Sequence, residues 1–213
     1  MGCHPVLGLT GNIGAGKSTV GALLRALGAR VIDSDQTVGS LLEHDACVQR
    51  RISEAFPQAR HPIEGIDRGA LAEVVFADKE KLLLLQELLY PSVGRETDRL
   101  TAEPTEASTT FIEAINVVEG PSGGDLDGLW IVEAEVEVMI QRVVVRGDLA
   151  PSDVRARLAM QAGPSSKAAA FRCLHPDKPI TRILNNGTLS CLRERVAGAW
   201  EDLASGSSCV QSG

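Results

Sequence analysis

Apolar and polar positions near the start of the chain follow first a strand pattern and then a helix pattern. Residues 6–10 form a short apolar run that ends at a glycine-rich segment, which is typical of a buried parallel strand. From Lys17 the apolar side chains recur at helical spacing, and Gly28 suits the end of that helix. Residues 29–33 again have the pattern of a strand. Together these segments predict a strand, loop, helix and strand joined by a right-handed crossover.

Strands and helices alternate again in the second half of the chain. Apolar runs predict strands at residues 109–114, 129–132 and 180–184. Helical periodicity covers residues 135–145 and 189–203, and Pro151 is typical of another helix start. Strands that alternate with helices predict an α/β fold, with a parallel sheet flanked by helices.

A different pattern separates the second strand from the third. Residues from about 36 to 106 are mostly helical in periodicity, and Pro57, Pro62 and Pro91 divide the helices. We interpret this stretch as a helical insertion. The predicted organisation is a nucleotide-binding core of residues 1–36 and 107–213, with a lid at about 146–165, and an inserted substrate domain over residues 37–106.

Composition narrows the class of protein. The 213 residues carry a net charge of −7, and 44% are apolar but only 3% aromatic. An acidic chain with few aromatic side chains is poorly suited to nucleic acid. No apolar run approaches the roughly 20 residues that cross a bilayer, and the first residues lack a signal-peptide pattern. We expect a cytoplasmic protein, a monomer or small homo-oligomer, with neither a nucleic-acid nor a membrane partner.

The glycine-rich segment fits the phosphate-binding pattern GxxxxGK[ST], in the strand-to-helix context that this pattern requires. Glycines let consecutive N–H groups point inward at phosphate oxygens, and the helix start adds its positive end. Lys17 is expected to reach the β- and γ-phosphates of ATP, and the Ser18 hydroxyl to bind Mg²⁺. The predicted nucleotide-binding residues are Gly11, Asn12, Ile13, Gly14, Ala15, Gly16, Lys17, Ser18 and Thr19.

The phosphate loop by itself does not separate kinases from GTPases and motor ATPases. The chain has no NKxD motif for reading guanine, and it is short for a motor ATPase. A small kinase with a substrate subdomain and a lid fits the arrangement better.

Three acidic residues follow predicted strands. Asp33 and Asp35 come at the carboxyl end of the second strand, the edge where open α/β sheets bind ligands. An acid there can accept the proton of an acceptor hydroxyl or hold Mg²⁺, and the alternative role is a helix N-cap. Glu113 ends the third strand, where a carboxylate can face the metal, and a surface acid is the alternative.

Arginines gather around the predicted lid, at positions 142, 146, 155 and 157. Mobile guanidinium groups can neutralise the charge that phosphoryl transfer spreads over the equatorial oxygens. The alternative for each of them is a solvated helix face with ion pairs. We expect one functional arginine among the four. In the insertion, Arg68 follows Asp67 and is a candidate for binding an anionic substrate.

Several of these motifs together resemble the dephospho-CoA kinase family, from Gly8 to about Trp200. The opening GLTGNIGAGKSTV and the later GARVIDSD, residues 28–35, are similar to that family's phosphate loop and VIDxD element. The Ile66-Asp67-Arg68 segment, the RLxxQ element of residues 157–161 and the Asn-Asn-Gly of residues 185–187 are supporting matches.

The resemblance implies ATP-dependent phosphorylation of the 3′-hydroxyl of dephospho-CoA, the last step of coenzyme A synthesis, with Mg²⁺ as the ion. It implies that Asp35 contacts that hydroxyl, that Asp33 lies nearer the metal beside Ser18, and that the insertion holds the acceptor. The expected catalytic residues are Asp35, Lys17, Arg142 and Arg146, and the expected substrate residues are Asp35, Arg68 and Glu113.

The chain also departs from the family pattern. Glu113 stands where most members have Asp, residues 113–119 lack the usual proline, and Tyr90-Pro91 replaces His-Pro. Two alternatives therefore stay open. One is another small P-loop kinase, for a nucleotide or a sugar, and the other is a non-catalytic regulator that binds ATP or CoA.

Overall fold

The computed structural model describes residues 4–61, 65–147 and 149–206, and it separates into two compact units. The first combines the chain up to Ile32 with the chain from Pro104 onward, and the second is residues 33–103. The sequence predicts an insertion over 37–106. Each unit has its own apolar core, and each is described by itself.

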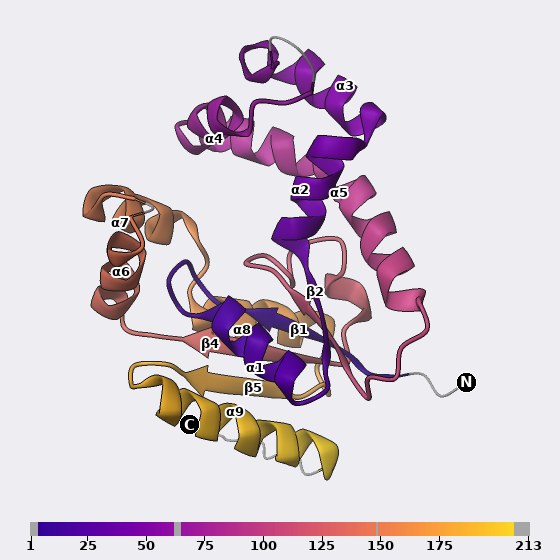
Figure 1. Ribbon diagram of the computed structural model, residues 1–213, viewed down its shortest axis with the longest axis vertical. Coiled ribbons are helices and arrows are strands. Elements are labelled where there is room, and N and C mark those ends of the chain that lie inside the picture. Colours follow the sequence, from indigo (N-terminus) through magenta and orange to yellow (C-terminus); the bar gives the residue numbers. More distant parts are fainter. Residues whose placement is uncertain (1–3, 62–64, 148, 207–213) are drawn as a thin grey trace. The chain divides into compact units, whose positions relative to one another are not determined.

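A parallel sheet organises the first unit (Figure 1). Its strand order is β2-β3-β1-β4-β5. The first strand, β1, pairs in parallel with β3 in the register Leu7↔Phe111 and with β4 in the register Leu7↔Gly128. The strand bounds are β1 Val6–Thr10, β2 Arg30–Asp33, β3 Thr110–Glu113, β4 Gly128–Glu133 and β5 Ile180–Leu184.

Helices cover both faces of this sheet, because alternate strand residues are apolar on opposite sides. Leu9, Trp130 and Val132 pack on α1 (Lys17–Ala26) and α9 (Leu189–Ala204). Leu129 and Ile131 pack instead on α8 (Pro164–Leu174) and on the segment around η2 (Gly123–Asp125). The paired helices α6 (Val136–Val145) and α7 (Pro151–Met160) share a small core of their own. The predicted α/β fold is confirmed.

Helices make up the second unit among its described residues, apart from one isolated β-bridge between Arg60 and Ile66 (Figure 1). Its elements are α2 (Ser34–His44), α3 (Ala46–Ala55), η1 (Pro57–Ala59), α4 (Arg68–Phe76) and α5 (Lys79–Ala102). Asp33, Asp45, Asp67 and Asp78 each accept N–H bonds at a helix start, which satisfies donors that the helix leaves open. Ile52, Phe56 and Val75 form the centre of its core.

Two sequence-based expectations differ from the structure. Pro91 was expected to separate helices, yet it lies inside α5, where Leu89 and Val93 on either side are buried. Burial of that apolar face outweighs the hydrogen bond that proline removes. The other difference is α8, which was not predicted. Of the other dividing prolines, Pro57 begins η1, and Pro62 lies outside the described residues.

Candidate active site

The phosphate loop connects β1 to α1, as the motif predicts. Gly16 precedes the first helical residue with a left-handed φ of 100°. A Cβ atom built on Gly16 would lie 2.3 Å from Asn185 Nδ2, and one on Gly14 would lie 2.5 Å from the Met139 carbonyl oxygen. Glycine is therefore required at both positions by conformation and by space. The loop so formed presents the N–H groups of a helix start, which is a site for phosphate.

Asn185 holds the phosphate loop from the side of β5. Its buried side chain donates a hydrogen bond from Nδ2 to the Ala15 carbonyl oxygen at 2.8 Å. Its Oδ1 accepts a bond from the Arg142 guanidinium at 3.3 Å. The Asn185 amide thus links the loop to α6 and orients the Arg142 guanidinium. The sequence interpretation gave Asn185 no role in the site, and the Asn-Asn-Gly segment was the signal that could have found it.

The Ser18 hydroxyl and the Glu113 carboxylate meet beside the loop. Ser18 Oγ donates to Glu113 Oε1 at 2.8 Å. The Glu113 side chain is buried at 4% exposure, whereas Ser18 in the first turn of α1 is exposed. The surface-acid alternative for Glu113 is therefore wrong. A hydroxyl and a carboxylate at this distance are the hard oxygen donors that Mg²⁺ prefers, so these residues fit the ion that the fold implies.

Among the residues that the structure describes, no group of three or more His, Cys, Asp and Glu side chains is placed to hold a metal ion. Magnesium in phosphoryl-transfer sites keeps several waters and is bound by one or two protein ligands together with substrate phosphates. The Ser18 and Glu113 pair supplies donors of that kind.

The segment after Glu113 is anchored from two sides. Ile115 directs its carbonyl oxygen at two donors, the Thr10 hydroxyl at 2.7 Å and the Lys167 ammonium group at 2.5 Å. Lys167 is fully buried on α8, and this burial lowers its pKa, while the charge of Glu119 acts in the opposite direction. The sequence interpretation missed Lys167, because no periodicity marked its helix.

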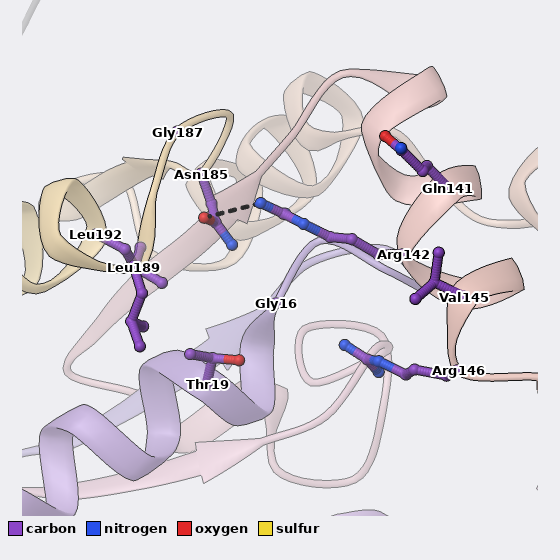
Figure 2. Close-up of a pocket in the computed structure, with 10 residues that line it drawn as sticks. All are labelled: Gly16, Thr19, Gln141, Arg142, Val145, Arg146, Asn185, Gly187, Leu189 and Leu192. Atoms are coloured by element: carbon purple, nitrogen blue, oxygen red, sulfur yellow. Dashed lines mark hydrogen bonds between the residues drawn. The ribbon is translucent and has the colours of Figure 1, made fainter.

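A pocket of about 430 Å³ opens next to the phosphate loop (Figure 2). Thr19 lies on its floor, and Figure 2 shows Arg142 extending across it to Asn185. Apolar side chains and a planar guanidinium suit an aromatic ring. The lining residues are Gly16, Thr19, Gln141, Arg142, Val145, Arg146, Asn185, Gly187, Leu189 and Leu192. The structure therefore brings the predicted Arg142 and Arg146 together at one cavity.

Residues of the predicted lid touch the loop directly. Gln161, just after α7, accepts a hydrogen bond from the Ile13 N–H at 2.9 Å. Arg155 instead makes an exposed ion pair with Glu137 at 2.9 Å, which is the solvated-face alternative. An exposed pair of this kind adds little stability. Gln161, like Asn185, was matched to a motif but not predicted to lie in the site.

The helical unit carries the remaining predicted residues. Asp33 Oδ1 accepts bonds from the N–H groups of Asp35 and Gln36 at 2.9 and 3.2 Å, so this oxygen caps α2. Asp35 is exposed in the first turn of that helix. A Cβ built on Gly39, one turn further on, would lie 3.2 Å from Arg68 Nη1. The Arg68 guanidinium, from the start of α4, therefore lies against the face of α2 that also carries Asp35.

The sequence also matches a known protein family. Residues 5–174 match the family model described as dephospho-CoA kinase. A dephospho-CoA kinase of Thermobifida fusca is 33% identical over 198 residues, which is 92% of this chain and 95% of that protein.

Solved structures agree with the observed fold. A Thermus thermophilus crystal structure with 33% identity has a TM-score of 0.72 and covers 99% of this chain and 100% of its own. A shikimate kinase of Acinetobacter baumannii, in complex with shikimate, has 13% identity and a TM-score of 0.51, and it covers 95% of this chain and 94% of its own. The second likeness shows the fold alone.

Proposed function

Since this chain belongs to the dephospho-CoA kinase family, we propose that it transfers the γ-phosphate of ATP to the 3′-hydroxyl of dephospho-CoA, giving ADP and coenzyme A. The observation that carries the proposal is the phosphate loop whose Ser18 hydroxyl is bonded to the buried Glu113 carboxylate, beside a pocket that suits a nucleobase. This reaction is the last step of coenzyme A synthesis.

The loop and the pocket divide the binding of ATP between them. The Ile13 and Ala15 N–H groups already donate to Gln161 and Asn12. The other N–H groups of the loop and the Lys17 ammonium group hold the β- and γ-phosphates, with the helix dipole of α1 behind them. The adenine ring occupies the pocket against Val145 and Leu189, with the Arg142 guanidinium over its face. Arg146 lines the same pocket and supplies a second positive charge.

Ser18 and Glu113 are the proposed protein donors for Mg²⁺. When bound, the ion neutralises charge on the triphosphate during phosphoryl transfer. Ser18 provides its hydroxyl oxygen, and the Glu113 carboxylate accepts the hydroxyl proton in a hydrogen bond. Asp33 remains a candidate through Oδ2, since Oδ1 already caps α2.

The helical unit is the proposed holder of the acceptor. Asp35 accepts a hydrogen bond from the 3′-hydroxyl and takes its proton as the new phosphate ester forms. The Arg68 guanidinium lies against the same face of α2 and binds an anionic part of the acceptor, because a guanidinium pairs with two phosphate oxygens at once. Positioning and charge neutralisation supply the catalysis.

A coupled assay of ADP release tests the assignment. We expect turnover with dephospho-CoA and ATP in the presence of Mg²⁺, with coenzyme A as the second product. Nucleoside monophosphates and shikimate serve as comparison acceptors and should give no turnover. Turnover of a nucleoside monophosphate but not of dephospho-CoA would overturn the acceptor. Tight ATP binding without ADP release from any acceptor would support the regulator instead.

A further inference from the structure

The Glu113 carboxylate lies in a confined space between β3 and α1. Its Oε1 accepts the Ser18 hydroxyl bond at 2.8 Å, so this oxygen has a fixed neighbour. Its Oε2 faces Gly21, one turn further along α1, where a Cβ atom would lie 2.7 Å away. That separation is shorter than real Cβ contacts. The next atom from such a Cβ is Val31 Cγ1 at 3.5 Å, an ordinary contact.

Gly21 has no conformational reason to be glycine. It lies inside α1 and is buried, and helical backbone there accepts any L-residue. Glycine in a helix interior weakens the helix compared with alanine. The conflict that an alanine would meet is with one oxygen of Glu113. The side chain that the glycine makes room for is therefore the acid beside Ser18.

We propose that Gly21 is a positioning residue for phosphoryl transfer, which sets where the Glu113 carboxylate lies against the Ser18 hydroxyl. This inference rests on the proposed function, in which that pair binds Mg²⁺. Glu113 is one methylene longer than aspartate, and the missing methyl at Gly21 accommodates its end. The two positions form a size-matched pair, a long acid facing a residue without a side chain.

The proposal makes a specific claim about Gly21→Ala. A carboxylate is the end of a flexible side chain, so it can swing away from a new methyl group with little loss of stability. What it then loses is its alignment with Ser18. The Mg²⁺ concentration for half-maximal rate should therefore rise about tenfold or more, as expected when the partners of a metal site are disturbed. ATP binding measured in EDTA should stay unchanged.

Gly198→Ala is the matched control. Gly198 also lies inside a helix, α9, and beyond its chain neighbours and the backbone of that helix a Cβ there would meet no described atom within 4 Å. This variant should raise the melting temperature and leave the Mg²⁺ dependence as it is. Gly21→Ala should raise the melting temperature less. A Gly21→Ala protein with the Mg²⁺ dependence of the wild type would overturn the proposal.

Rescue by a shorter acid separates positioning from a general packing effect. Glu113→Asp alone should raise the Mg²⁺ concentration for half-maximal rate, because a carboxylate shortened by one methylene no longer reaches the Ser18 hydroxyl. The double variant Gly21→Ala with Glu113→Asp should perform better than the product of the two single effects predicts. Strictly multiplicative effects would show that the two positions act independently, and would contradict the pairing.

A readout without turnover separates this proposal from the function on which it rests. Thermal unfolding of the ligand-free wild type, both single variants and the double variant gives the coupling between the positions directly. If no acceptor is phosphorylated, the proposed function fails, yet a non-additive shift in melting temperature would still support the pair. If dephospho-CoA is turned over and the shifts add, the pair fails and the function stands.

Discussion

Asp33 and Asp35 stand two positions apart at the start of α2 and have different surroundings. Asp33 uses Oδ1 to cap the helix, as short polar side chains do at this position. Asp35 is exposed in the first turn of the same helix. The sequence placed both at the ligand-binding edge, but it could not tell which carboxylate the cap would occupy.

Asp35→Asn should lower kcat by about 10²–10⁴, the usual contribution of a general base, with little change in ATP affinity. Steady-state kinetics and a separate ATP titration measure the two quantities. Glu80→Gln is the matched control, because Glu80 is also an exposed acid in the first turn of a helix. Equal losses in turnover and ATP affinity would count against Asp35 as the base.

Lys17→Ala should remove most of the stabilisation by ATP. A ligand at a hundred times its Kd stabilises the folded state by about 2.7 kcal/mol, and a variant that cannot hold the phosphates loses that gain. A thermal shift with and without ATP measures it. Lys79→Ala is the control, since Lys79 is likewise the first residue of a helix, α5. An undiminished shift in the Lys17 variant would refute its phosphate contact.

Among single residues, those within a contiguous motif could be predicted from the sequence. Lys17 and Ser18 are fixed by the spacing of the phosphate loop. Asn185 and Gln161 act through hydrogen bonds to residues more than a hundred positions away, at Ala15 and Ile13. A one-dimensional pattern contains no record of such pairs, so their place in the site appeared only in the structure.

At the scale of elements, amphipathic periodicity located most strands and helices but misjudged α5. The expected break at Pro91 did not occur, because residues on both sides of it bury one face of a continuous helix. The apolar pattern also failed to predict α8. One of its buried positions is Lys167, a charged residue, so the buried face of this helix does not read as apolar in the sequence. In both helices, burial against the rest of the fold outweighed the local sequence preference.

Pro91→Ala should stabilise the protein by about 2 kcal/mol. Proline in a helix interior costs about 3 kcal/mol relative to alanine, and its stiffening of the unfolded chain returns about 1 kcal/mol. Pro91 is exposed, so the change leaves no cavity. Urea unfolding measures the difference, as a shift in midpoint at constant m.

Pro57→Ala is the comparison for that measurement. Pro57 begins η1, where its missing N–H is harmless, and it is also exposed. Alanine there should lower the free energy of unfolding by about 0.5–1 kcal/mol, through the unfolded chain alone. Equal shifts in the two variants would show that the helix interior is not strained by Pro91.

At the scale of the whole molecule, a buried lysine ties stability to pH. Burial lowers the pKa of Lys167 below the ordinary lysine value of 10.5, and the charge of Glu119 acts in the opposite direction. Below the folded-state pKa both states hold the proton and the slope is zero. Between that pKa and 10.5 the unfolded state binds more protons, so the free energy of unfolding rises with pH. Above 10.5 the dependence disappears again.

Lys167→Met should remove this alkaline rise, while Thr10 continues to donate to the Ile115 carbonyl oxygen. Urea unfolding of both proteins from neutral pH up to pH 10 gives the difference in free energy at each pH. Subtraction cancels the other groups that titrate in this range. A difference that stayed flat, or that favoured the variant as pH increased, would contradict the lowered pKa.

The strand order also dictates when the molecule can be completed during its synthesis. Of the five strands in this sheet, β1 is translated before its neighbours β3 and β4, which follow about a hundred or more residues later. In the meantime residues 33–103 emerge and can bury their own core. An apolar strand with bare edges is prone to aggregate. The pace at which the ribosome translates this insertion therefore sets how long β1 stays exposed in the nascent chain.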